Sequence, residues 1–193
     1  MLRRLYDWTM GLAAHRHARP AIAGVAFIES SFFPIPPDIL LMPMVLADRD
    51  RAFRIAGICT IASVLGGMLG YAIGYFLWEA IGQPLIAFYG YAEKFTAFQG
   101  GYNEYGAWIV AFFGLTPFPY KVITIASGVT QLNILTFMVA SVLSRGARFY
   151  IVAFLLWRFG EPIRAFIERY LGLLTILFFV LLFGGFVALK YLL

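Results

Sequence analysis

The chain has 193 residues, of which 62% are hydrophobic and 18% aromatic, and its mean hydropathy is +0.82. A soluble domain of this length cannot bury so much apolar surface, so the composition indicates an integral membrane protein. The formal net charge of +5 does not indicate nucleic acid. The basic residues form short clusters at the ends of apolar segments, where lipid headgroups are the expected neighbours. We therefore expect membrane lipid, and no nucleic acid, as a partner.

The first 19 residues mix apolar and basic side chains. Their spacing predicts an amphipathic helix over 1–19 that lies on the membrane surface. His15 and His17 are two residues apart on its polar side. A metal site needs a third ligand, so we expect neither a metal nor a cofactor here.

The next apolar region, residues 20–47, is interrupted where a membrane helix should be continuous. Pro34, Pro36 and Pro37 lack a backbone N–H and push the residues before them out of the helical region. Neither arm reaches the ~20 residues that a spanning helix needs. Basic residues stand before and after the region, and such ends prefer the cytoplasm. We therefore predict a re-entrant helical hairpin that enters and leaves on the cytoplasmic side.

Two carboxylates, Glu29 and Asp38, flank this interruption. Irregular backbone at membrane depth survives only where it is buried in protein or lines a wet cavity. A carboxylate at that depth is costly, so the pair indicates a site for substrate or for proton coupling. Glu29 has no close partner in the sequence and is our candidate for reversible protonation.

Residues 52–80 run apolar without proline and predict a spanning helix that completes a first repeat over 20–80. Three glycines recur every fourth residue in it, at Gly66, Gly70 and Gly74. This stripe predicts close packing against another helix or the hairpin tip. Residues 81–106 contain one lysine and no arginine. They are predicted to form an interfacial linker outside.

Residues 107–159 repeat the first arrangement. The run PFPYK at 117–121 matches PIPPD at 34–38, so Pro117 and Pro119 break a second apolar segment. An internal repeat with one broken apolar segment in each half is typical of transport sites.

The second hairpin is predicted over 107–130, and a spanning helix over 134–159 returns the chain to the cytoplasm. No positive charge follows this hairpin, so we expect it to enter from outside and the two repeats to be inverted. Residues 171–190 predict a C-terminal spanning helix.

Arg145 and Arg148 stand near the middle of the helix predicted over 134–159, three residues apart and so on one face. At that depth we expect them to meet buried carboxylates or an anionic ligand, with snorkelling towards the headgroups as the alternative. Lys121 occupies the position in the second repeat that Asp38 occupies in the first, and we expect these two side chains to pair. The surplus positive charge could then receive a phosphate, unless the charges form a purely structural network.

At these residues the chain resembles the DedA family, also called the VTT or SNARE-associated membrane domain family, over roughly residues 20–160. The resemblance rests on Glu29 followed by FFPIPPD, and on GGMLGYAIGY, FFGLTPFPYKVITIASG and SRGARF. The chain looks most like the short subgroup with the PIPPD form. The resemblance implies two opposed re-entrant hairpins with spanning helices. Family members are implicated in moving undecaprenyl phosphate or phospholipids across the bacterial inner membrane, in some cases driven by protons.

We therefore expect an all-α integral membrane protein: two oppositely oriented re-entrant hairpins, about three spanning helices and an N-terminal amphipathic helix. It is expected in the bacterial inner membrane with a cytoplasmic N-terminus, and a homo-oligomer is compatible with the sequence. The predicted function is translocation of a phosphate-bearing lipid. Glu29 and Asp38 would couple it to protons, and Lys121, Arg145 and Arg148 would bind the phosphate.

Two other functions stay open: a secondary transporter of small ions or solutes, and a membrane-homeostasis factor that transports nothing. We do not expect an enzyme. Phosphatases that act on lipids need histidine as nucleophile and acid, and both histidines lie outside the apolar region.

Overall fold

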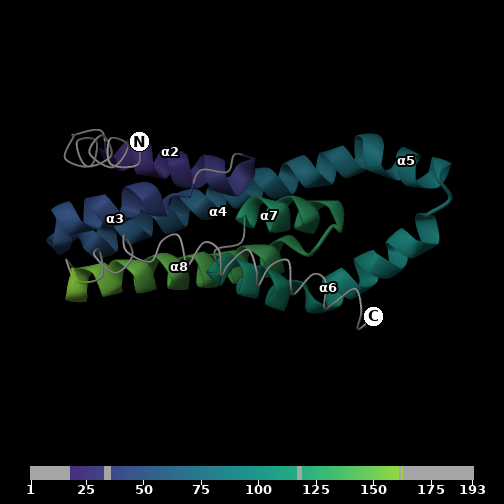
Figure 1. Cartoon of the computed structure of the whole chain (residues 1–193). Coiled ribbons are helices and arrows are strands. Elements are labelled where there is room, and N and C mark those ends of the chain that lie inside the picture. The colour runs from purple at the N-terminus through teal and green to yellow at the C-terminus, as the bar shows by residue number, and fades with distance from the viewer. Residues whose placement is uncertain (1–17, 33–35, 117–118, 161, 163–193) are drawn as a thin grey trace.

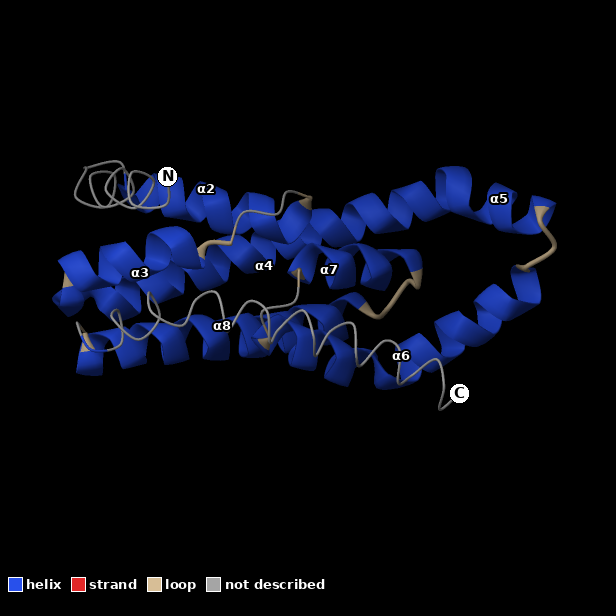
Figure 2. Ribbon diagram, in the orientation of Figure 1, coloured by secondary structure: helices blue, strands red, loops and turns tan. Residues whose placement is uncertain are grey.

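The computed structural model describes residues 18–32, 36–116, 119–160 and 162, and these residues are helical apart from short connections. The ribbon contains no strand in this part of the chain (Figure 2). The helices predicted over 1–19 and 171–190 lie outside the described residues, except that Ala18 and Arg19 begin α2. The expected all-helical fold is confirmed for the described ranges.

The first predicted interruption is present. Helix α2 (Ala18–Ser31) ends before the prolines, and α3 (Asp38–Ala47) begins directly after Pro37. Pro37 has φ −65° and ψ −19°, which suits the start of a helix because the missing N–H has no partner there. Pro36 also lies in the connection, and Pro34 falls outside the described residues. Between α2 and α3 the chain turns back on itself (Figure 1).

A 3₁₀ turn (Arg49–Arg51) leads into α4 (Ala52–Leu77), which continues through a π-helical turn (Trp78–Gly82) into α5 (Gln83–Phe88). The continuous segment Arg49–Phe88 has 40 residues and is apolar enough to cross a membrane. At about 1.5 Å per residue it is about 60 Å long. Because a hydrocarbon core is about 30 Å thick, an upright α4 would extend α5 beyond it.

Helix α6 (Ala92–Leu115) starts after a reversal at Gly90, whose φ is +71°. The predicted linker over 81–106 is therefore helical over most of its length, and the helix before the second interruption begins at Ala92 rather than at residue 107. Gly100 and Gly101 lie inside α6, because one glycine costs a helix only about 1 kcal/mol and neighbouring residues outweigh that. Gly106 also gives the Leu132 side chain room to pack against α6.

The second interruption separates α6 from α7 (Tyr120–Val129). Pro119 stands immediately before α7, and Pro117 lies outside the described residues. Helix α8 (Ile134–Phe159) matches the predicted span and is the second helix in the described part that could cross a membrane. Its start is capped by the Asn133 side chain, which accepts from the N–H groups of Leu135 (3.0 Å) and Thr136 (3.2 Å).

Helix α4 is the centre of the arrangement, because α2, α7 and α8 all pack against it. The glycine stripe explains two of these contacts. A Cβ at Gly66 would collide with the Phe27 carbonyl of α2, and a Cβ at Gly74 with the Ile125 carbonyl of α7. The predicted close packing along this stripe is confirmed.

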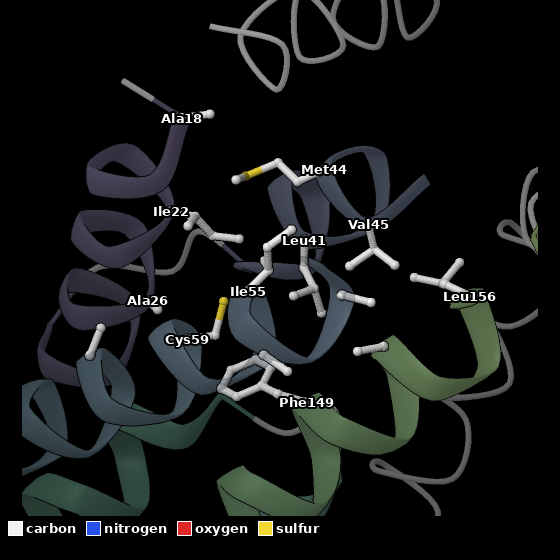
Figure 3. Close-up of a cluster of buried hydrophobic side chains, with 14 residues drawn as sticks. Ala18, Ile22, Ala26, Leu41, Met44, Val45, Ile55, Cys59, Phe149 and Leu156 are labelled. Carbon is white, nitrogen blue, oxygen red and sulfur yellow. The ribbon is translucent and has the colours of Figure 1, made fainter. Parts of the chain in front are cut away.

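Two apolar clusters stabilise the helices at different levels. Figure 3 shows the first, into which side chains of α2, α3, α4 and α8 point. The second joins α6, α7 and the start of α8, with Tyr71 of α4 packed against it. The first cluster includes Ala62 and Phe149, and the second includes Ala140. On both α4 and α8 a stretch therefore separates the two clusters, and the site lies there.

Candidate functional site

Buried polar side chains fill the level between the two apolar clusters. They come from the end of α2, the middle of α4, the middle and end of α7 and the middle of α8. The structure places the predicted residues on four helices: Glu29 near the end of α2, Asp38 at the start of α3, Lys121 in the first turn of α7, and Arg145 and Arg148 on α8. The buried polar and charged residues in and around this site are Glu29, Ser30, Ser31, Thr60, Ser63, Thr124, Ser127, Ser141, Ser144 and Arg145.

Arg145 and Glu29 form a buried ion pair. Arg145 Nη2 donates to Glu29 Oε2 at 2.8 Å, and the two side chains are 1% and 11% exposed. Removing two charges from water costs several kcal/mol per ion. The attraction between the two ions offsets this cost only when their remaining polar atoms also form hydrogen bonds. The stability of the pair therefore depends on the side chains around it.

Two serines close a ring of hydrogen bonds around this ion pair. Arg145 Nε donates to Ser63 Oγ (2.6 Å), and Ser30 Oγ donates to Glu29 Oε2 (3.0 Å). The two hydroxyl oxygens lie 2.6 Å apart. Ser30 already gives its only proton to Glu29, so Ser63 must donate to Ser30. The ring thus runs from the guanidinium to the carboxylate along two arms, one direct and one through both hydroxyls, so Arg145 donates along both arms and Glu29 accepts from both.

Two aromatic rings lie against the Arg145 guanidinium. Its Cζ lies 4.8 Å from the ring centroid of Tyr120 and 4.7 Å from that of Phe149. Both distances are in the range of cation–π attraction. The Tyr120 hydroxyl in turn lies 2.5 Å from Ser141 Oγ. The start of α7 is thereby fixed against α8.

Arg148 connects the two helix breaks. Its Nη2 donates to Asp38 Oδ2 at 2.5 Å, at the start of α3, and its Nη1 donates to the Thr116 carbonyl at 2.7 Å, at the end of α6. A carboxylate at a helix N-terminus and a cation at a helix C-terminus both suit the helix dipole. The sequence predicts that the arginines meet buried carboxylates or an anionic ligand, and both pair with carboxylates: Glu29 is buried and Asp38 is partly buried.

The predicted pairing of Asp38 with Lys121 is wrong, because Asp38 binds Arg148 instead. Lys121 Nζ donates to the Phe32 carbonyl just beyond the end of α2, at 3.4 Å. The lysine therefore joins the second break to the first, but through a backbone oxygen. No carboxylate in the described ranges lies within ion-pair distance of Lys121.

Two buried atoms of the site lack a hydrogen-bond partner among the described residues: Arg145 Nη1, a donor, and Asp38 Oδ1, an acceptor. A buried polar atom left unpaired costs about 1–3 kcal/mol. Each belongs to one of the ion pairs, so both pairs retain unused bonding capacity.

The sequence did not single out Ser30, Ser63, Tyr120 or Thr116 as site residues. Small polar residues in apolar helices commonly serve packing, so Ser63 carried no signal of its own. Ser30 follows Glu29 directly, and adjacency to a buried carboxylate was the one available indication. Among the residues that the structure describes, no three histidine, cysteine, aspartate or glutamate side chains lie together as metal ligands would.

Comparison with known proteins identifies the family. The family model described as the VTT domain matches residues 35–158. An uncharacterized protein of Haemophilus influenzae is 37% identical over 165 residues, which is 86% of this chain and 85% of that protein. An uncharacterized protein of Histophilus somni is 37% identical over 168 residues, covering 85% and 87% respectively. No solved structure matches the chain. With its two long apolar helices, the chain belongs to the VTT domain family, the DedA family, and is a membrane protein as members of that family usually are.

Proposed function

We propose that this protein is a multi-pass transporter that moves a phosphate-bearing lipid, undecaprenyl phosphate or a phospholipid, across the bacterial inner membrane. We place it with the short PIPPD-type members of its family, with the N-terminus in the cytoplasm. The five charged side chains that converge at the two helix breaks support this function most strongly. Charges at membrane depth are expensive and usually belong to a substrate or proton pathway.

The packing pattern supports an inverted repeat of two re-entrant hairpins. Helix α4 packs on α2 of its own half and on α7 of the other half. Helix α8 likewise packs on α6 of its own half and on α3 of the other. Each long helix thus contacts the first arm of its own hairpin and the second arm of the other. This pattern of contacts, in which each long helix packs on a short helix of the other half, is expected when two repeats are related by an axis in the membrane plane.

The charge balance favours an anionic substrate. Two carboxylates neutralise the two arginines, and Lys121 carries the remaining positive charge beside the end of α2. A phosphate headgroup at the breaks would meet a lysine that pairs with no carboxylate in the described ranges. Arginine is the better oxyanion ligand because its planar fork donates two parallel hydrogen bonds. In this proposal Lys121, Arg145 and Arg148 together bind the headgroup as transport proceeds.

Protons supply the coupling in this proposal. Protonation of Glu29 or Asp38 removes the negative charge that holds its arginine, and the guanidinium then becomes available to the headgroup. Return of the proton to the other side would restore the ion pair and expel the phosphate. Transport and proton movement would thus use the same side chains.

Transport by the purified protein in liposomes tests the proposal. Fluorescent undecaprenyl phosphate and a fluorescent phospholipid are placed in the membrane, and their movement between leaflets is followed by quenching from outside. A third sample contains trapped inorganic phosphate. We expect movement of at least one lipid with the wild type and with Lys94→Ala, whose ammonium lies over the exposed Tyr91 ring. We expect Lys121→Ala to abolish it.

Two results would overturn lipid transport. Wild-type protein and protein-free liposomes could move both lipids at the same rate. Alternatively, release of inorganic phosphate without lipid movement would favour the solute transporter.

A further inference from the structure

An open apolar groove of about 270 Å³ adjoins Arg148. Leu115 at the end of α6 and Ile151 and Val152 on α8 line it together with the arginine. The Leu115 and Ile151 side chains are 48% and 52% exposed. Helix α8 is one of two helices in the described part that are long and apolar enough to span a membrane. Exposed apolar side chains on such a helix suit contact with hydrocarbon, so lipid is the neighbour that this groove fits best.

A charged group stands at this apolar groove. Arg148 is 15% exposed, and its Nη1 and Nη2 are bound to Thr116 and Asp38. Its Nε has no hydrogen-bond partner among the residues that the structure describes. By contrast, Arg145 is completely buried under two aromatic rings. The two arginines therefore differ in access, and of the two only Arg148 lines the groove.

The size of the groove decides what kind of molecule fits. Sites for small molecules typically enclose about 300–1,000 Å³ and bury most of the ligand. An open groove of about 270 Å³ holds only part of a molecule, and its walls are almost entirely apolar. One stretch of a long hydrocarbon chain satisfies both conditions, and the rest of the chain would stay in the bilayer.

We propose that this groove is the lateral entry site for the lipid, with one acyl or prenyl chain along Leu115, Ile151 and Val152 and the phosphate at Arg148. The inference rests on the proposed function and adds the place and the residues of first binding. The Asp38 carboxylate holds the position at Arg148 that the phosphate would take. Because the planar fork of a guanidinium can donate two hydrogen bonds to either a carboxylate or a phosphate, the lipid and Asp38 compete for one arginine.

Photocrosslinking tests the groove without requiring transport. The photoreactive residue p-benzoyl-phenylalanine replaces Ile151 in the full-length protein, purified in dodecyl maltoside. The matched control carries it at Leu143, which is 66% exposed on α8 but does not line the groove. Each protein receives one of two lipid pairs: phosphatidic acid or diacylglycerol with identical chains, and undecaprenyl phosphate or undecaprenol. Intact mass spectrometry counts the lipid adducts.

We expect the Ile151 position to label the phosphorylated member of at least one pair about tenfold more than its uncharged partner, as one charge-assisted hydrogen bond would give. Leu143 should label both members equally. Asp38→Asn should increase the preference, since the competing charge is gone. The double variant Asp38→Asn with Arg148→Gln should abolish it, and that variant leaves no unpaired charge that could unfold the protein.

Three results would overturn the groove as an entry site. The Ile151 position could show no preference in either pair, or Leu143 could show the same preference. The Ile151 position could also crosslink to a second copy of the chain in place of lipid. Lipid transport in liposomes together with any of these results would rule out the entry site but leave the proposed function standing. Preferential labelling without transport would support the groove as a lipid-binding site but rule out lipid transport as the function.

Discussion

Arg145 and Arg148 lie one helical turn apart on α8, yet they bind carboxylates from opposite sides of the first helix break. Glu29 precedes the break and binds Arg145, and Asp38 follows it and binds Arg148. Helix α8 therefore fixes both α2 and α3, on the two sides of the break. The prolines create the reversal between these helices, and the two ion pairs determine where it sits.

Removing Glu29 should destabilise the protein severely. In Glu29→Ala the Arg145 guanidinium stays buried without its counter-charge, and breaking one partner of a buried ion pair costs about 3–5 kcal/mol. Denaturant unfolding in detergent micelles measures this loss. The double variant Glu29→Gln with Arg145→Met should lose much less, because no charge remains buried. A single variant within about 1 kcal/mol of the wild type would show that Arg145 finds water or another partner.

Ser63→Ala should also be costly, although it removes only one hydroxyl. The substitution leaves Arg145 Nε without a hydrogen-bond acceptor, and Nη1 of the same guanidinium already lacks one among the described residues. An unpaired buried donor costs about 1–3 kcal/mol, at the upper end for a charged group. Thr60→Val is the matched control on the same helix, since among the described residues Thr60 Oγ1 bonds only to the Ala56 carbonyl one turn earlier. Equal unfolding free energies for the two variants would contradict the closed ring.

Much of this arrangement could be predicted from proline and charge. The two breaks follow from the positions of Pro37 and Pro119, because proline ends a helix wherever its neighbours cannot compensate. The depth of Arg145 and Arg148 in an apolar helix was enough to predict buried partners. Both inferences use local sequence and the cost of polar groups in hydrocarbon.

The choice of partners could not be predicted in the same way. The repeat aligns Asp38 with Lys121, but equivalent positions in two repeats need not touch. Arg148 reaches Asp38 and the end of α6 together because the guanidinium has several donors in a fixed fork. The lysine, a compact charge, binds one helix-end carbonyl. The pairing depends on the length of each side chain and on the geometry of its hydrogen-bond donors in the folded protein. Neither can be derived from the alignment of the two repeats.

Tyr120→Phe separates the two roles of this side chain. The phenylalanine ring still covers Arg145, but Ser141 Oγ loses its partner at 2.5 Å. We expect a loss of about 1 kcal/mol for the hydrogen bond. Tyr120→Leu removes the ring as well and should lose a further ~0.5–2 kcal/mol of cation–π attraction. Unfolding of both variants in micelles measures the difference, and identical values would show that the ring contributes no attraction to Arg145.

Gly74→Ala should disturb the contact between the two halves. The new Cβ would collide with the Ile125 carbonyl, and a backbone atom of α7 cannot rotate away as a side chain can. Overpacking of this kind costs about 1–3 kcal/mol. Gly100→Ala on α6 is the control, because its Cβ would meet nothing within 4 Å and the residue is exposed. Alanine there should stabilise the helix by about 0.8–1.0 kcal/mol. The two substitutions add the same methyl group, so opposite signs in thermal unfolding identify the close approach of α7 to α4 as the cause, and a stabilising Gly74→Ala would contradict that approach.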